Sequence, residues 1–323
     1  MRIALFLPHV GVFGGVRRFI ELGNVWARGG HSVALYQPGG TAPDWLSFAG
    51  RAAGLEAARS EPSDLALCAD AATFDAFLAH PASARLYYCV IEGDANLDRA
   101  ARTPGMRLAA NSGTLRRHVA ARTGRPVIDG IGGINVEQFH PDAAQRGALP
   151  RVLVNGRRSR AKKGTDLILR ALSPLAGRAA PFEIVLFDTV SEQNRQDPRD
   201  GARLPPNARF VLGPTQGELV ALYQSSCLFV AAERKAGWCN TALEAMAAGC
   251  AVVCTRSGTT DFARDGMNAL VTLRHPWFLR RAIARALSDQ ALRERLSAAG
   301  PATAAEWTWE RLGRKLLDQL EAR

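Results

Sequence analysis

The segment KAGWCNTALEAMAAGCAVVC, residues 235–254, contains the pattern that repeats along most of this chain. Its middle part, NTALEAMAAG, begins with residues that favour the start of a helix. The last part, AVVC, is an apolar run of the length of a buried strand. A helix that leads directly into such a strand is typical of parallel sheets covered on both faces. The one acidic side chain of the segment, Glu244, is expected in the first turn of this helix.

The same alternation of apolar runs and helical patterns occurs in both halves of the chain. In the first half a strand over 2–8 precedes a helix over 15–30. In the second half a strand over 151–156 precedes a helix over 164–177. Strands that alternate with helices predict parallel α/β sheets. Residues 132–150 are rich in Gly and Pro and show no period, which indicates a domain linker.

We therefore predict an α/β protein with two facing Rossmann-like domains, 1–143 and 144–300, and a cleft between them. The closing residues 301–323 are expected to form a helix that packs back across the domain interface. Their apolar residues recur at helical spacing, which indicates packing rather than a cofactor site. Ligands of open parallel sheets bind at the carboxyl ends of the strands, so the functional residues are expected there.

The composition is that of a large cytoplasmic protein with a basic surface. The chain has 323 residues, with 41 Lys and Arg against 30 Asp and Glu, and a formal charge of +11. Its six cysteines form no CxxC pair, which favours reduced, buried thiols. No apolar run approaches the ~18 residues of a membrane span. The positive charge reflects either an arginine-rich composition or an anionic partner, such as phosphate, nucleic acid or a lipid surface.

Two loops at predicted strand ends carry residue types that bind phosphate. Gly14 and Gly15 follow the first strand and let a ligand approach the N-terminus of the next helix. Their loop is not GxGxxG, which argues against a nicotinamide dinucleotide site. Arg158 and Lys163 lie on a loop closed by Gly164 and would neutralise a diphosphate without a metal ion. The structural alternatives are an ordinary turn and a solvated basic loop.

The order of these and other motifs resembles one enzyme family. The chain is similar to the family 4 glycosyltransferases of the GT-B fold in the segments GINVEQFHP (133–141), GRRSRAKKG (156–164), FVLGPTQGELVALYQSSCLFVAA (210–232), GWCNTALEAMAAGCAVV (237–253) and SGTTDFARDGMNALV (257–271). The resemblance extends over nearly the whole chain. Each segment alone is unspecific, whereas the cluster in this order is specific.

The resemblance implies transfer of a sugar from a UDP- or GDP-sugar to an acceptor hydroxyl, with retention at the anomeric carbon. The second domain would bind the donor, and the first would hold the acceptor. Glu244 matches the family's glutamate that binds the ribose hydroxyls. Arg158 and Lys163 match the pair that grips the diphosphate, and Gly14 and Gly15 match the loop that faces the same phosphates. The donor loop and helix start would add Gly237, Trp238, Asn240 and Thr241.

Glu244 also has a structural interpretation. Thr241 to Glu244 is an S/T-x-x-E sequence, the pattern of a capping box in which the glutamate bonds back to the backbone. A carboxylate has two oxygens, so capping and ribose binding can overlap.

The sequence departs from the family pattern at two places. The family has a second glutamate that faces the transferred sugar, and the matching residue here is Ala236, with Glu233 three residues earlier. Many members also have a histidine in the first domain, where this chain has YYCVIEGDAN. Glu92 and Asp94 are therefore the candidates for facing the acceptor hydroxyl, although a polar loop explains them equally well. His9 is a further candidate.

No DxD motif occurs, so neither a metal ion nor a cofactor is predicted. The acceptor is expected to be a glycan or a lipid-linked saccharide, with the basic first domain resting on anionic lipid. A hydroxyl-bearing base of nucleic acid is an alternative acceptor. Two other functions remain open: a GT-B epimerase or phosphorylase, and a binder of nucleotide sugars without catalysis. The sequence leaves the oligomeric state open.

Overall fold

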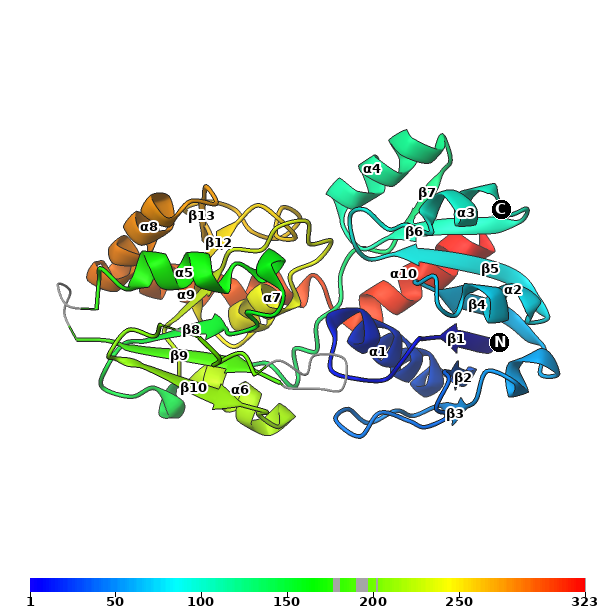
Figure 1. Ribbon diagram of the computed structural model, residues 1–323, viewed down its shortest axis with the longest axis horizontal. Helices are drawn as coiled ribbons and strands as arrows, with labels where there is room; N and C mark the ends of the chain where they lie inside the picture. Colours follow the sequence, from blue (N-terminus) through cyan, green and yellow to red (C-terminus); the bar gives the residue numbers. More distant parts are fainter. Residues whose placement is uncertain (177–180, 190–196, 202, 323) are drawn as a thin grey trace. The chain divides into compact units, whose positions relative to one another are not determined.

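The computed structural model describes residues 1–176, 181–189, 197–201 and 203–322 (Figure 1). The chain divides into two compact units. The first comprises Met1–Gly133 and Trp309–Arg323, and the second comprises Ile134–Thr308. Each unit has its own parallel sheet with helices packed against it, as the alternation of apolar runs and helical patterns predicts.

The first unit contains a seven-stranded sheet in the order β3-β2-β1-β4-β5-β6-β7, with every neighbouring pair parallel. The strands are β1 (Arg2–Phe6), β2 (Ser32–Tyr36), β3 (Arg51–Ala53), β4 (Ser63–Cys68), β5 (Ala82–Cys89), β6 (Met106–Ala110) and β7 (Val127–Asp129). The helices are α1 (Gly14–Arg28), α2 (Phe74–Ala79), α3 (Leu97–Arg102), α4 (Gly113–Thr123) and α10 (Trp309–Glu321), with a 3-10 turn η1 (Ala57–Arg59).

Both faces of this sheet are covered by helices. Leu5 of β1 packs in a core cluster with side chains of α1 and α10, whereas its neighbour Phe6 packs in another with side chains of α2, α3 and α4. Successive side chains of a strand point to opposite faces. Burial on both faces therefore explains why the central strands are continuous apolar runs rather than alternating ones.

The second unit contains a six-stranded parallel sheet in the order β10-β9-β8-β11-β12-β13. The strands are β8 (Arg151–Asn155), β9 (Glu183–Asp188), β10 (Ala208–Leu212), β11 (Leu228–Ala231), β12 (Ala251–Thr255) and β13 (Leu270–Thr272). The helices are α5 (Thr165–Leu172), α6 (Gln216–Gln224), α7 (Asn240–Ala247), α8 (Pro276–Ser288) and α9 (Gln290–Ala305), with 3-10 turns η2 (Ala143–Gln145) and η3 (Ala161–Lys163).

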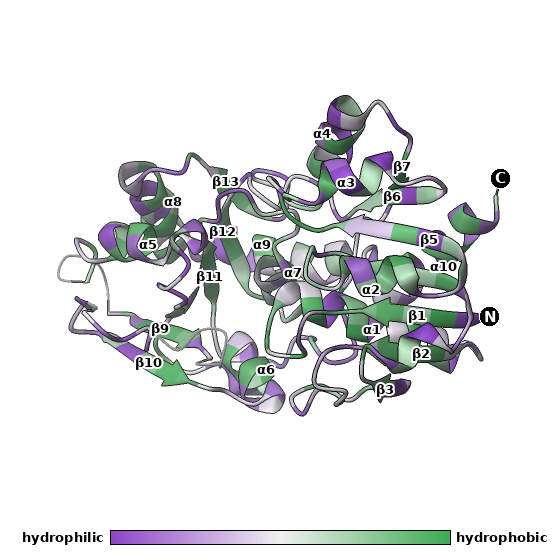
Figure 2. Cartoon of the chain, turned by 45° about the vertical axis from the view of Figure 1, so that its right-hand side comes forward, coloured by the Kyte–Doolittle hydropathy of each residue, from purple (hydrophilic) through white to green (hydrophobic). Residues whose placement is uncertain are grey.

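The core of the second unit is built around β8, β11 and β12. Apolar side chains of α5, α8 and α9 pack together with those of the strands. Figure 2 shows β11 and β12 hydrophobic along their length, which fits strands buried between layers. Helix α7 contacts both of these strands as well as α9.

The division between the units falls after Gly133 rather than at the predicted position 143/144. The reason is visible at Phe139, which is fully buried and packs edge-on against Tyr223 of α6 at 5.7 Å between ring centroids. Phe139, which lies inside the stretch read as a linker, thus belongs to the core of the second unit. At the other end, the return to the first unit comes at Trp309, and α10 packs there on α1 and β7.

Within the part of the chain that the structure describes, no helix combines the length and apolar character needed to cross a membrane. The six cysteines are free thiols, and all except Cys227 are buried.

Candidate functional site

The candidate site is built from the loops that follow β8, β9 and β11 of the second unit. Arg157 lies two residues after β8, and its Nε donates to Oδ1 of Asp188, the last residue of β9, at 2.8 Å. Because β8 and β9 are parallel neighbours, their carboxyl ends bring these residues together. Burial raises the pKa of Asp188, and the charge of Arg157 opposes that rise. Asp188 therefore fixes the guanidinium at the edge of the sheet.

A glycine places Lys163 beside the end of β11. Lys163 ends the turn η3, and Gly164 follows with a φ of +79°, in the left-handed region. A Cβ at this position would lie 2.2 Å from the carbonyl oxygen of Ala232. Only glycine permits both the conformation and the close approach. The loop is closed by the hydroxyl of Thr165, which donates to the Asn155 carbonyl at 2.9 Å.

Lys163 forms an ion pair with a buried carboxylate. Its Nζ donates to Oε1 of Glu233 at 2.6 Å, and the exposed fractions of the two side chains are 25% and 8%. Burial alone would lower the pKa of Lys163, but the charge of Glu233, its hydrogen bond and the nearby Cys239 together outweigh burial and raise the pKa above 10.5. Lys163 is therefore an ammonium at neutral pH. The thiol of Cys239 donates to the same oxygen at 3.5 Å.

Glu244 is the second buried carboxylate of the site. It is 5% exposed, and its Oε2 accepts a hydrogen bond from the hydroxyl of Tyr223 at 2.9 Å. Tyr223 is itself completely buried among the rings of Phe139, Phe187 and Phe229. Burial and the nearby Glu244 raise the pKa of Tyr223 well above 10.0, so it remains a hydrogen-bond donor. A rigid aromatic cluster thus holds the Glu244 carboxylate in place.

The capping-box interpretation of Glu244 is wrong. Helix α7 begins at Asn240 with Cys239 as its N-cap, and no side chain caps it. Thr241 is therefore already inside the helix, and the helix has no acidic residue in its first turn. Glu244 lies one turn further in, not at the position that the sequence suggested. The hydrogen bond from Tyr223, rather than a cap, accounts for its orientation.

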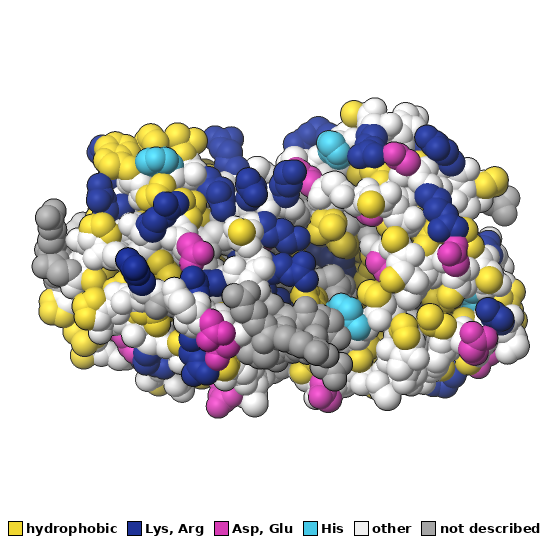
Figure 3. Space-filling model, in the orientation of Figure 1, with side chains coloured by type: hydrophobic (Ala, Val, Ile, Leu, Met, Phe, Trp, Pro, Cys, Tyr) yellow, Lys and Arg dark blue, Asp and Glu magenta, His cyan; other side chains and the backbone are white. Residues whose placement is uncertain are grey.

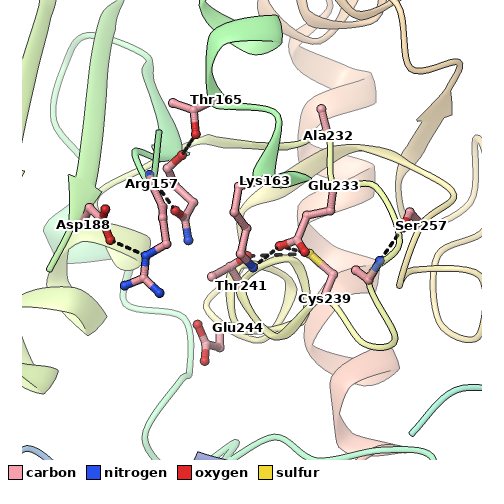
Figure 4. A network of polar contacts seen from close by, with 12 residues as sticks. Arg157, Lys163, Thr165, Asp188, Ala232, Glu233, Cys239, Thr241, Glu244 and Ser257 are labelled. Carbon is pink, nitrogen blue, oxygen red and sulfur yellow. Dashed lines mark hydrogen bonds and ion pairs between the residues drawn. The ribbon is translucent and has the colours of Figure 1, made fainter. Parts of the chain in front are cut away.

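The charged side chains converge on one space. Figure 4 shows Arg157 and Lys163 directed from their loop toward Thr241 and Glu244 of α7. Two cations, a carboxylate and the start of a helix therefore lie around one edge of the second sheet. Backbone N–H groups at a helix start and cations together favour the binding of an anion.

Arg158 is not part of this convergence. Its Nε donates to Oδ1 of Asp166 at 2.7 Å, and its Nη1 donates to the carbonyls of Pro198 and Asp200 at 3.3 and 2.6 Å. The structure thus brings Lys163 together with Arg157, whereas the sequence paired it with Arg158. The difference follows from the carboxylate that each arginine pairs with. Arg157 pairs with Asp188 of the adjacent strand, whereas Arg158 pairs with Asp166 of α5.

The donor loop predicted around Gly237 and Trp238 is held by the segment after β12. The N–H of Ala236 donates to Oγ of Ser257 at 2.9 Å, and the N–H of Cys239 donates to the Gly258 carbonyl at 2.9 Å. Trp238 is 7% exposed and packs against Phe262 and Trp307. It supports the loop from behind, and its ring is largely withdrawn from solvent. Gly237 is also buried, whereas Asn240 and Thr241 are half-buried at the helix start.

In the first unit, Gly14 and Gly15 open α1, whose N-cap is Phe13. A Cβ on Gly15 would meet only Val90 at an ordinary 3.9 Å. His9 accepts a hydrogen bond from the N–H of Gly11 at 3.1 Å, and burial lowers its pKa. The approach of this loop to a donor, which would involve residues of both units, stays a prediction.

The two acidic residues after β5, Glu92 and Asp94, have different surroundings. Oδ2 of Asp94 accepts from the hydroxyl of Tyr87 at 2.7 Å, and Oδ1 accepts from the N–H of Asn96 at 2.9 Å. Asp94 thereby organises the turn before α3. Glu92 is half-buried in the same loop. Their role toward an acceptor stays a prediction.

Comparison with known proteins identifies a family for this chain. The family model described as "Glycosyl transferases group 1" matches residues 137–303, which include every residue of the candidate site in the second unit. No curated protein matches the chain.

Solved structures with the same fold include sucrose-phosphate synthase from Thermosynechococcus elongatus, at 16% identity, a TM-score of 0.79 and 99% coverage of both chains. HepE from Anabaena, solved in complex with UDP and glucose, has 14% identity, a TM-score of 0.76 and 100% coverage of both chains. A glycosyltransferase from Rickettsia africae has 15% identity, a TM-score of 0.74 and coverage of 98% of this chain and 97% of its own. At such identities the likeness shows the fold, which is GT-B. Since the family model spans more than half of the sequence, the chain belongs to the group 1 glycosyl transferases.

Proposed function

We propose that this glycosyltransferase binds a nucleoside diphosphate sugar at the carboxyl edge of its second sheet and transfers the sugar to an acceptor hydroxyl with retention. The observation that carries the proposal is the convergence of Arg157, Lys163 and Glu244 beside the start of α7 (Figure 4). UDP- and GDP-sugars are the donors that the sequence resemblance implies. HepE, a protein of the same fold, was solved with UDP.

In this proposal Arg157 and Lys163 bind the diphosphate and stabilise the charge that develops as it leaves. The ammonium of Lys163 has three N–H donors and Glu233 accepts from one, so the group can also bind a phosphate oxygen. The guanidinium of Arg157 is held through Nε by Asp188 and matches phosphate in geometry. Fixed cations of this kind act where charge develops in the transition state. They would take the part that a metal ion plays in other transferases.

Glu244 is proposed to bind the ribose hydroxyls of the donor. Its carboxylate accepts hydrogen bonds, and Tyr223 holds it beside the helix start that would receive the phosphates. Arg157 takes the place assigned to Arg158 by the sequence, because the guanidinium of Arg158 is bound to Asp166 and to backbone carbonyls.

Glu233 is proposed to replace the acid that the family has at position 236. Ala236 offers no carboxylate, and the Glu233 carboxylate lies on the same loop, paired with Lys163. It would orient the cation and face the donor sugar. This arrangement differs from the family pattern and supports a specificity of its own for the sugar.

The first unit is proposed to hold the acceptor, with Glu92 or Asp94 near its hydroxyl. A glycan or a lipid-linked saccharide is the acceptor class that we propose. No observation in the described residues favours nucleic acid over these, so we do not propose it further.

The test is donor binding and turnover. Thermal unfolding with UDP, GDP and their sugars identifies the nucleotide, because a ligand at 100 times its Kd adds about 2.7 kcal/mol. Glu244→Ala should abolish this stabilisation, whereas Glu294→Ala, at an exposed site of α9, should preserve it. Transfer that persists in excess chelator would support independence from metal. Tight binding without transfer or hydrolysis would identify a non-catalytic binder instead, and equal stabilisation of both variants would refute the site.

A further inference from the structure

Aromatic side chains at the start of α8 are exposed to solvent and do not pack in the core. Leu273, Trp277 and Phe278 are 61%, 41% and 38% exposed. The opposite side of the helix carries Leu279 and Ile283, which are completely buried in the core of the second unit. The exposed residues are therefore not needed to attach α8 to its sheet. We call Leu273, Trp277, Phe278, Arg280 and Arg281 the α8 patch.

The two aromatic rings of the patch form one apolar surface. The centroids of Trp277 and Phe278 are 4.7 Å apart, with the rings perpendicular. The helix start that carries them is fixed: Pro276 is its first residue, and Nδ1 of His275 accepts from the N–H of Trp277 at 3.3 Å. Figure 3 shows hydrophobic side chains gathered over the α8 end of the second unit, with Lys and Arg beside them. The rings are thus held outward on a rigid element.

All charged residues in the sequence segment that contains the patch are basic. Residues 273–288 contain four arginines and no acidic residue. The guanidinium of Arg281 lies over the ring of Trp277 at 4.7 Å from its centroid. Arginine in this position keeps its charge at the level of the aromatic ring, as it does at membrane surfaces. The chain as a whole carries +11, which adds attraction to an anionic surface.

We propose that the α8 patch docks on the surface of an anionic phospholipid bilayer, with Trp277, Phe278 and Leu273 in the headgroup region and the arginines on lipid phosphates. Tryptophan and arginine together at the polar boundary are characteristic of such contacts. A second copy of this chain fits less well, because a two-fold contact would face arginines with arginines. Nucleic acid would satisfy the charges but would leave Leu273 exposed.

This docking surface differs from the one that the sequence suggested, which lay on the first domain. It does not depend on the proposed transfer reaction. One hydrogen bond links the patch region to the candidate site: Nε of Arg274 donates to the carbonyl of Ala232, next to Glu233. Docking through α8 would therefore place the donor loop of the same unit near the bilayer.

The experiment is co-sedimentation of the full chain with vesicles of phosphatidylcholine alone or mixed with phosphatidylglycerol. We expect binding to the mixed vesicles only, weakened by salt. The double variant Trp277→Ala/Phe278→Ala should weaken binding tenfold or more, since roughly 150 Å² of exposed ring surface would leave water at ~25 cal/mol per Å². Arg281→Glu should weaken it at least fivefold, because each basic residue near an anionic surface contributes about that factor.

Arg117→Glu on α4 is the matched control, since Arg117 is an exposed arginine of the first unit. Donor-dependent thermal stabilisation should be unchanged in every variant, which shows that they fold. Quenching of tryptophan fluorescence by brominated lipid should be smaller in Trp277→Phe than in the wild type. Three results would overturn the proposal: no binding to anionic vesicles, loss of binding in Arg117→Glu with retention in the α8 variants, or concentration-dependent self-association that the α8 variants abolish.

Discussion

Replacing Lys163 by alanine should lower both stability and activity, and the two losses have separate causes. Lys163 and Glu233 are 2.6 Å apart, and the Glu233 side chain is only 8% exposed. Lys163→Ala therefore leaves a buried carboxylate without its cation. Removing one partner of a buried pair costs about 3–5 kcal/mol. Because the Lys163 side chain is a quarter exposed, we expect about 3 kcal/mol, or roughly 6–12 °C in the unfolding midpoint.

The double variant Lys163→Ala/Glu233→Gln separates these causes. Glutamine removes the stranded charge, so most of the lost stability should return. The cation for the leaving diphosphate is still missing, so sugar transfer should remain about 10²-fold or more below the wild type. Lys162→Ala is the control, since it removes the same charge from the neighbouring residue of the loop. It should change turnover by less than about threefold, as expected for a charge that does not touch the donor.

The single variant Glu233→Gln gives the pH dependence. In the wild type Glu233 raises the pKa of Lys163 above 10.5, so the ammonium persists until the pH exceeds that value. Without Glu233, burial dominates and lowers the pKa. Donor affinity should then begin to fall at a lower pH than in the wild type. Unfolding midpoints, donor turnover and donor Kd against pH in the wild type and the four variants test the scheme. Wild-type turnover in the double variant would refute it, because Lys163 would then serve only to neutralise Glu233.

Four other substitutions test neighbouring parts of the site. Arg157→Ala should lower transfer about 10²-fold, whereas Arg158→Ala should leave donor affinity within about threefold; steady-state kinetics of the pair decides which arginine binds the diphosphate. Tyr223→Phe removes one buried hydrogen bond of about 1 kcal/mol, so the KM for the donor should rise about fivefold with kcat little changed, and an unchanged KM would contradict its positioning role. Gly164→Ala forces a methyl group against a carbonyl oxygen at a left-handed position, and a midpoint within about 2 °C of wild type would contradict the packing described.

The sequence predicted both sheets because strands that are buried on two faces have continuous apolar sequences. The apolar runs over β1 and β12 are examples. The sequence indicated Lys163 because a lysine stands on a basic loop, closed by Gly164, that follows a predicted strand. The sequence could not show which of Arg157 and Arg158 lies beside Lys163. That depends on Asp188, which is distant along the chain and becomes a neighbour of the loop only through strand pairing. The position of Glu244 within α7 was also missed, because Cys239 is not a residue that signals an N-cap.

The ion pairs around the site have a consequence for the proposed reaction. Arg157 and Lys163 each face a carboxylate before any donor is bound, so the two pairs together are nearly neutral. Cations that are already neutralised by fixed carboxylates attract a ground-state diphosphate only moderately. The attraction between these cations and the phosphate grows as the leaving phosphate gains charge, because the cations are already fixed and need little reorganisation. In this arrangement Asp188 and Glu233 would reduce donor affinity slightly while they direct the cations. Glu233→Gln should therefore bind free nucleoside diphosphate at least as well as the wild type at neutral pH, yet transfer sugar more slowly. Weaker binding with an unchanged rate of transfer would show that Glu233 serves ground-state binding instead.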